Sequence, residues 1–245
     1  MDELLNNEAA RQRMALIWKR RALGEHQATA RFGLYAERMR SLGGIPQVFQ
    51  DKAIEASQQE LEHKAVCLEM AHRLGCDEIE FEKSDFGENE GFDQSNMLAD
   101  MVRLGCVVET INTAQLATAL HQITEPEVRN ATRKILADEV QHSRLGWAYL
   151  AWARSEGQGE LLAQHIPKML WEATGPDIFM DPPPHPEQEL LFRMGDPPMS
   201  ARRDLFVHTV TDVILPGLDA NGISTVAARA WLANPTWPAA VLARY

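Results

Sequence analysis

The sequence has few of the features that stabilise secreted domains or anchor proteins in membranes. Its 245 residues include three cysteines and no Cys-x-x-Cys pair, which argues against a disulfide framework and against a four-cysteine iron site. No apolar run reaches the roughly 18 residues that a membrane-spanning helix needs. The first residues lack the positive charge of a secretory signal. We therefore expect a cytoplasmic protein with no membrane partner.

Basic residues are also scarce. There are 24 Lys and Arg against 35 Asp and Glu, a formal net charge of −11. This balance argues against nucleic acid as a partner. Strand-like alternation of useful length is absent, and so is a repeat at a solenoid period. With 45% hydrophobic residues, the chain has ample material for a core, and the expected fold class is all-α.

Helical periodicity dominates the first two thirds of the chain, where apolar residues recur at steps of three and four. The predicted long helices are 7–42 (with a joint near Gly24), 46–74, 95–121 and 125–155. Residues 75–94 lack this periodicity and are expected to form a long connection. Shorter helices are expected at 158–174, 200–215 and 224–233, between proline-rich loops. We predict a helical bundle over 1–155 and a helical extension over 156–245.

Two Glu-x-x-His pairs, Glu60/His63 and Glu139/His142, lie in the second and fourth long helices. The first and third helices carry the lone glutamates Glu25 and Glu109 on their inward stripes. Four carboxylates and two imidazoles in this arrangement are the ligand set of a dinuclear iron or manganese site in a four-helix bundle. Without metal ions, burial of four carboxylates would cost several kcal/mol per charge.

The spacing from the predicted turns places these residues at matching depths. In an antiparallel helix pair, residues equidistant from the turn lie side by side. Glu25 is about 18 residues before the turn at 43–44, so its neighbour is expected near residue 62, between Glu60 and His63. Glu109 is about 14 residues before the turn at 123–124, so its neighbour is expected near residue 138. Each hairpin therefore brings its own donors together.

The long connection supports the same topology. About 20 extended residues span roughly 60 Å, which exceeds the ~40 Å length of a 27-residue helix. The second helix can therefore end at one end of the bundle while the third begins at the other. This arrangement is a bundle with one long crossover.

A third Glu-x-x-His pair, Glu69/His72, serves as a control for helical phase. It lies nine residues beyond Glu60/His63, which at ~100° per residue is half a turn out of phase. If the first pair faces inward, the third faces solvent.

Residues 22–155 resemble the ferritin-like di-iron carboxylate superfamily, which includes bacterioferritins, rubrerythrins, ribonucleotide reductase small subunits, bacterial hydroxylases and aldehyde-deformylating oxygenases. The pattern also resembles small bacterial ferritin-like proteins of undefined activity. The resemblance implies bridging carboxylates at Glu60 and Glu139 and terminal ones at Glu25 and Glu109. Each histidine would bind one of two iron ions, with manganese as an alternative.

The resemblance also implies roles for neighbouring residues. Asp138 would hold His63, and by pseudo-symmetry Gln59 would hold His142; the alternative for Asp138 is a plain surface acid. Thr113 lies one turn after Glu109, where bacterial hydroxylases have a threonine close to the site of dioxygen activation. It is thus a candidate catalytic residue. A bond from its hydroxyl to the carbonyl of Glu109 is the structural alternative.

The expected function is a di-iron oxidase or oxygenase that activates dioxygen to oxidise a small organic substrate. Such an enzyme needs an external electron donor, either ferredoxin-like or a flavin reductase, and the extension could cap a pocket or form a homodimer. Iron oxidation or peroxide scavenging, a manganese catalase-like reaction, and a non-catalytic metal staple remain as alternatives. A storage cage is disfavoured because storage ferritins commonly lack a second histidine and have one short helix after the bundle.

Overall fold

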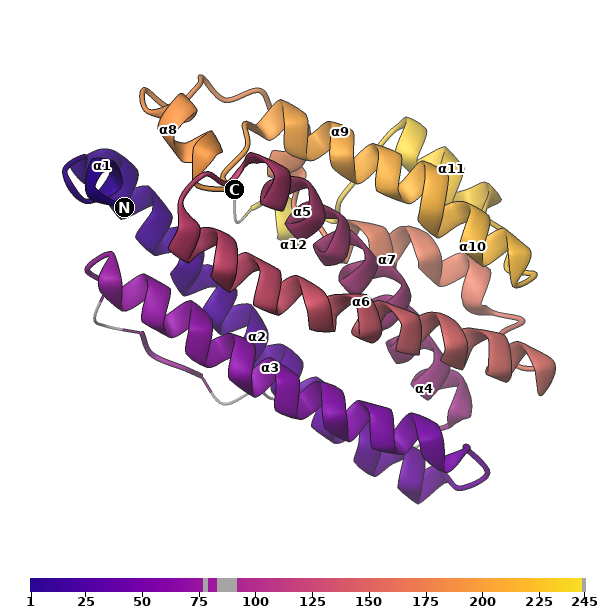
Figure 1. The fold of residues 1–245 in the computed structure, drawn as a ribbon. Coiled ribbons are helices and arrows are strands. Elements are labelled where there is room, and N and C mark those ends of the chain that lie inside the picture. Colours follow the sequence, from indigo (N-terminus) through magenta and orange to yellow (C-terminus); the bar gives the residue numbers. More distant parts are fainter. Residues whose placement is uncertain (77–78, 83–91, 244–245) are drawn as a thin grey trace. The chain divides into compact units, whose positions relative to one another are not determined.

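The computed structural model describes residues 1–76, 79–82 and 92–243, and among them it contains helices and no strands. The elements are α1 (Asp2–Leu5), α2 (Glu8–Leu42), α3 (Gln47–Arg73), α4 (Gln94–Met101), η1 (Val102–Val108), α5 (Glu109–Gln122), α6 (Pro126–Ser155), η2 (Leu162–His165), α7 (Ile166–Glu172), η3 (Pro176–Phe179), α8 (Gln188–Arg193), α9 (Met199–Thr209), η4 (Val210–Ile214), α10 (Leu215–Ala220), α11 (Val226–Ala233) and α12 (Ala239–Leu242) (Figure 1). Here η1 and η4 are π-helical, while η2 and η3 are 3₁₀-helical.

The chain forms two compact units, each made of discontinuous segments. Unit 1 contains residues 1–92, 116–138 and 185–197, and unit 2 contains residues 93–115, 139–184 and 198–245. The helices α5 and α6 each run from one unit into the other. The units are groups of packed residues and do not coincide with the predicted domain boundary at residue 155, which stays a prediction.

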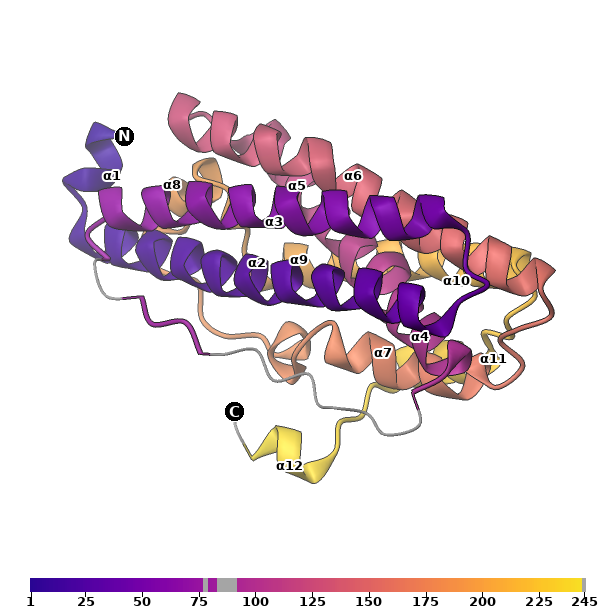
Figure 2. The ribbon, with the colours of Figure 1, turned by 90° about the horizontal axis from the view of Figure 1, so that it is seen from below.

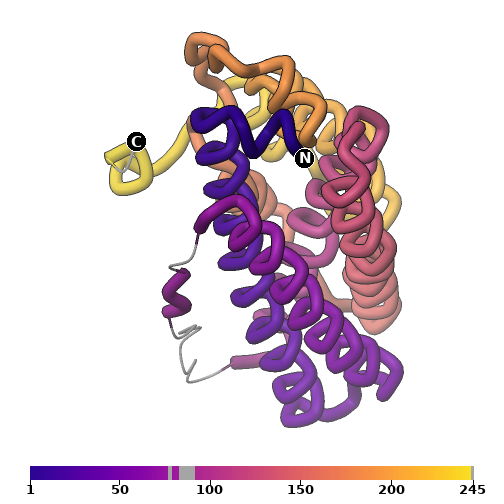
Figure 3. The backbone as a smooth tube through the Cα atoms, turned by 60° about the vertical axis from the view of Figure 1, so that its left-hand side comes forward, coloured from indigo at the N-terminus to yellow at the C-terminus, as the bar shows by residue number. Residues whose placement is uncertain are grey.

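The helices α2 and α3 form an antiparallel hairpin in unit 1, and they run side by side in Figures 2 and 3. Gly43 and Gly44 close the turn with φ angles of 66° and 72°, a left-handed conformation that favours glycine. Pro46 precedes α3 because its missing N–H is not needed at a helix start. The predicted turn at 43–44 is therefore confirmed.

Gly24 does not mark a joint, so that prediction is wrong. Helix α2 runs unbroken from Glu8 to Leu42, and nothing lies within 4 Å of where a Gly24 Cβ would be. The physical reason is length: one exposed glycine costs about 0.5–1 kcal/mol in a helix, too little to break a long helix that packs along one side.

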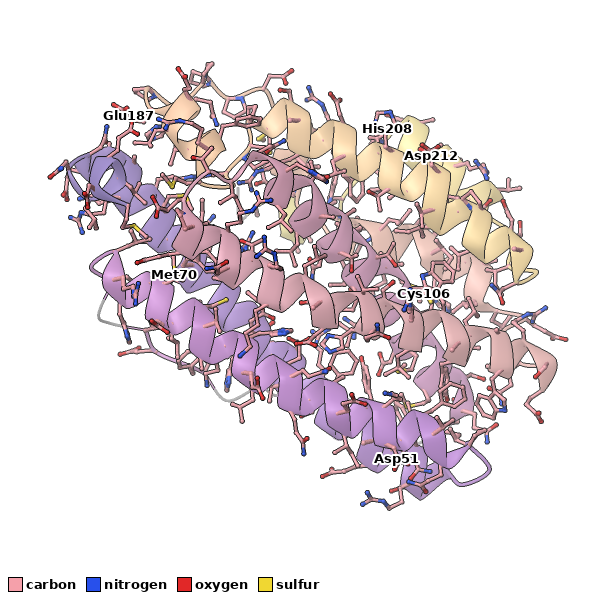
Figure 4. The ribbon with its side chains drawn as sticks, in the orientation of Figure 1. Asp51, Met70, Cys106, Glu187, His208 and Asp212 are labelled. Atoms are coloured by element: carbon pink, nitrogen blue, oxygen red, sulfur yellow. The ribbon has the colours of Figure 1, made fainter. Side chains whose placement is uncertain are left out.

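The core of unit 1 includes residues from both bundle hairpins. Its buried side chains include Trp18 of α2, Met70 of α3, Leu116 of α5 and Ile135 of α6. Met70 is labelled in Figure 4. The second hairpin turns before Pro126, which begins α6 one residue after the predicted helix start at residue 125.

Unit 2 contains a close contact between two helical backbones. A Cβ added to Gly146 of α6 would lie 2.5 Å from the Cα and carbonyl carbon of Gly105. Gly105 belongs to the π-helix η1, which inserts a wide turn just before Glu109. The sequence predicted one regular helix over 95–121. The wide turn has no propensity signal of its own, because a π-turn is stabilised by its tertiary surroundings.

The C-terminal region is helical, as predicted, with different boundaries. The first expected helix is a 3₁₀ turn, η2, followed by α7, which has Pro167 in its first turn. The second continues past residue 215 as α9, η4 and α10 without interruption. The short helices α8 and α12 were not predicted, since four to six residues are too few to show periodicity.

The long connection predicted over 75–94 lies partly outside the described residues, which omit 77–78 and 83–91. Within the part of the chain that is described, every helix is too short or too polar to cross a membrane.

The Gly105–Gly146 contact predicts opposite effects for two glycine-to-alanine substitutions. Gly146→Ala should destabilise the protein by about 1–3 kcal/mol, because the new methyl group has backbone against it. Gly24→Ala, also in a helix interior, should stabilise it by about 0.5–1 kcal/mol, since its Cβ points into open space. Urea unfolding of both variants measures the difference, and equal stabilities would contradict the close contact.

Candidate metal centre

Unit 1 brings together three of the six predicted donor residues. One ligand atom from each of Glu25, Glu60 and His63 lies within 4.8 Å of the others. Glu25 comes from α2, and the other two come from α3, across the hairpin. The depth matching predicted from the turn at 43–44 is therefore confirmed for this hairpin. We call these residues the first triad.

The imidazole of His63 is held from both sides. Its Nε2 lies 3.0 Å from Oδ2 of Asp138, and its Nδ1 lies 3.1 Å from Oε2 of Glu60. The predicted bond between Asp138 and His63 is therefore present. If Nε2 carries the proton and donates it to Asp138, the Nδ1 lone pair faces the carboxylates, as a metal ligand requires.

Gln59 supports the same arrangement. Its side-chain amide donates to Oδ1 of Asp138 at 3.2 Å, so the aspartate bonds to the imidazole through one oxygen and to the amide through the other. The sequence predicted a different partner for Gln59, namely His142. These two residues belong to different units, and that bond stays a prediction.

Unit 2 brings together the other three donors. One ligand atom from each of Glu109, Glu139 and His142 lies within 4.8 Å of the others, and Nδ1 of His142 is 3.3 Å from Oε2 of Glu139. We call these residues the second triad. The side-chain amide of Asn112 donates to Oε2 of Glu109 at 3.4 Å. Sequence reasoning missed Asn112, although its position three residues after Glu109 is the signal that could have found it.

Most of the ionisable side chains of the two triads are buried. The exposed fractions of Glu60, Glu109 and Glu139 are 1%, 2% and 2%, and both histidines are buried as well. A buried carboxylate costs several kcal/mol unless it is compensated, and a neutral imidazole supplies a hydrogen bond without a countercharge. Carboxylate oxygens and imidazole nitrogens are donors that iron and manganese accept. The residues present therefore fit a metal ion at each triad.

The control pair behaves as its helical phase predicts. Glu69 and His72 are exposed on α3, whereas Glu60 and His63 of the same helix are buried. Glu69 forms a solvent-exposed ion pair with Arg73 at 3.0 Å. The position of each pair around the helix thus determines which of two identical motifs is buried.

Thr113 lies one turn after Glu109, and its hydroxyl oxygen is buried with no hydrogen-bond partner among the described residues. The alternative expectation, a bond to the carbonyl of Glu109, is therefore wrong. Thr29 occupies the same offset after Glu25, and its hydroxyl does donate to the Glu25 carbonyl at 2.7 Å. The two threonines are equivalent in sequence position, and only the packing around them separates their roles.

Two cysteines are buried, as their spacing from the predicted donors indicates: Cys67 is four residues after His63, and Cys106 is three residues before Glu109. The Cys67 thiol is 4.0 Å from Oε1 of Glu25, within reach of a weak S–H bond. Cys106, labelled in Figure 4, is fully buried in unit 2, and burial raises the pKa of its thiol well above the usual value. A thiol of this kind stays protonated at neutral pH, so we assign Cys106 to core packing.

Comparison with known proteins bears on the fold. No family model matches the sequence, and no curated protein matches it either. Among solved structures, the chain is similar to one described as protein 19 with aldehyde deformylating oxidase activity from Synechococcus. The TM-score is 0.60 at 16% sequence identity, over 93% of this chain and 99% of that chain. At this identity the similarity shows the fold alone, which is all-α and ferritin-like, as predicted.

The first triad predicts different outcomes for two histidines of the same helix. His63→Ala should weaken metal binding by more than about 10-fold, because even the outer partners of metal ligands contribute 10–100-fold. His72→Ala should leave binding unchanged, since its ring faces solvent. Anaerobic Fe(II) titration of both variants measures the difference. Loss of binding in His72→Ala would show that the assignment of the inward face of α3 is wrong.

Proposed function

We propose that the two triads hold two iron ions in one dinuclear centre, and that the protein is an oxidase or oxygenase that uses dioxygen on a small organic substrate. The observation that carries this proposal is the pair of triads, each with two carboxylates and one imidazole, in which every residue except the half-buried Glu25 is buried. A dinuclear site needs this donor set twice. Manganese is the alternative metal for the same donors.

The continuity of α6 supports a single centre. Asp138, which contacts His63 of the first triad, directly precedes Glu139 of the second triad in this helix. Adjacent residues of an α-helix differ by about 1.5 Å along its axis. One unbroken helix therefore carries a contact residue of one triad and a donor of the other at nearly the same height.

Within such a centre the chain's residues take distinct roles. His63 and His142 would each bind one ion through Nδ1, the ring nitrogen that lies next to a carboxylate in each triad. Glu60 and Glu139 would bridge the ions, and Glu25 and Glu109 would each bind one. When bound, a pair of ferrous ions supplies the electrons with which dioxygen is reduced.

Thr113 is the proposed catalytic residue. A hydroxyl that is buried without a partner can donate a hydrogen bond to a molecule bound beside it. It can do so without first breaking a hydrogen bond within the protein. Its position four residues after Glu109 puts it on the same side of α5 as this donor of the second triad. We propose that Thr113 orients dioxygen or substrate at the centre.

The proposed class of reaction is dioxygen-dependent oxidation of an organic substrate. The proposal of substrate oxidation, with an external electron donor such as a ferredoxin-like protein or a flavin reductase, is supported by the fold shared with a protein of aldehyde deformylating oxidase activity. The helices after α6 also exceed what a storage cage needs. Aldehydes are therefore the first substrates to test.

Metal stoichiometry tests the dinuclear centre. The apo-protein should saturate near two Fe(II) per chain under anaerobic conditions, because each triad supplies the donors for one ion. Glu109→Ala should lower the number bound, while Glu69→Ala, which removes an exposed carboxylate of α3, should not. Equilibrium dialysis with iron analysis measures the number. Saturation at one ion or none in the wild-type chain would rule out the dinuclear centre.

Oxygen uptake tests the reaction class. The iron-loaded, chemically reduced protein should consume dioxygen faster with aldehydes present than without them, and a product should accumulate in proportion. Thr113→Val should reduce product formation while it leaves the iron content unchanged, because the hydroxyl is not a donor to the metal. Uptake that depends on excess Fe(II) and forms mineral would instead identify an iron oxidase.

A further inference from the structure

A chain of three polar side chains joins α5 to α6 inside unit 2. The indole N–H of Trp147 donates to Oγ1 of Thr110 at 3.1 Å, and this oxygen lies 2.8 Å from Oγ of Ser143. An indole N–H can only donate, so the threonine oxygen accepts it and its own hydrogen is available to Ser143. Each side chain in this network thus has a defined partner.

The network lies next to the second triad in the chain. Thr110 directly follows Glu109, and Ser143 directly follows His142. Trp147 is one helical turn beyond Ser143, on the same side of α6. The cross-links therefore connect the two helices one residue beyond their metal donors, so a shift in these bonds displaces Glu109 relative to His142.

The surrounding packing holds the network in place. Gly105 and Gly146 bring the two backbones into direct contact within two turns of Thr110. On its other side the Trp147 ring lies against Gly217 of α10, where an added Cβ would be 2.6 Å from Cη2 of the indole. Figure 2 shows α10 beside the second half of α6. Helix α10 thus packs against the ring that donates this hydrogen bond.

We propose that Trp147, Thr110 and Ser143 are positioning residues that set the spacing between Glu109 and the Glu139/His142 pair. Through Gly217, the C-terminal helices support the same spacing, which gives residues 198–220 a role in the metal centre. This inference rests on the proposed metal-binding function. The proposal predicts that loss of one neutral hydrogen bond alters the coordination geometry of a bound ion, even when every metal-binding side chain is retained.

The test uses Co(II), because its visible absorption reports the geometry of its ligands. The full-length wild-type chain and the variants Trp147→Phe and Thr110→Val are titrated with Co(II) alone. Both variants should shift the visible bands and weaken the binding of one ion by about 10-fold, the range found for groups that orient metal ligands. Thr110→Ser, which keeps the hydroxyl, should restore the wild-type spectrum.

Trp231→Phe is the matched control. It removes one indole hydrogen bond from the same unit, to the carbonyl of Thr236 at 2.9 Å, far along the chain from the triad. It should leave both the spectrum and the affinity unchanged. Loss of a purely structural hydrogen bond would lower only the melting temperature. If Trp147→Phe and Thr110→Val have no effect besides this one, the positioning role is wrong. If the wild-type chain binds no Co(II), the proposed metal-binding function fails instead.

Discussion

The burial of carboxylates is the constraint on which the rest of this structure depends. Glu60, Glu109 and Glu139 are almost inaccessible to water, and a carboxylate in such surroundings is costly unless positive charge and hydrogen bonds compensate it. The imidazoles lie beside these carboxylates for that reason. A pair of divalent cations would remove most of the remaining cost. The helices around each triad hold its carboxylates and its imidazole close enough together to bind one cation.

The two units build their triads by different means. In unit 1 the hairpin of α2 and α3 is sufficient, because a glycine turn sets the register and equal distances from the turn bring Glu25 beside the Glu60/His63 pair. In unit 2 a π-helical turn precedes Glu109, and two glycines allow the backbones to touch. Polar cross-links between α5 and α6 join the two helices beside these residues, in addition to the turn that precedes Pro126. The second triad thus has both backbone and side-chain contacts next to it.

Much of the candidate site could be predicted because the direction in which side chains point along a helix repeats about every 3.6 residues. Spacing, turn position and family resemblance together predicted the six candidate donors, the contact between Asp138 and His63, and the exposure of Glu69/His72. The predicted joint at Gly24 was wrong, because the helix propensity of one glycine is weak against the packing of a 35-residue helix. The hydrogen bond from Gln59 to Asp138 could not be predicted, because an amide can donate to any of several acceptors nearby.

The sequence by itself determined the all-α class, the helix faces and the candidate donor residues, because hydrophobic periodicity and motif spacing are local properties of the chain. The tertiary structure alone decided which hydroxyls are bonded and where a helix widens. Thr29 and Thr113 have the same offset from a donor glutamate, yet only Thr29 bonds the carbonyl one turn back. Likewise, the contact of Gly105 with Gly146 joins residues 41 positions apart. Such features depend on which residues pack against a helix, and a local sequence pattern does not specify those neighbours.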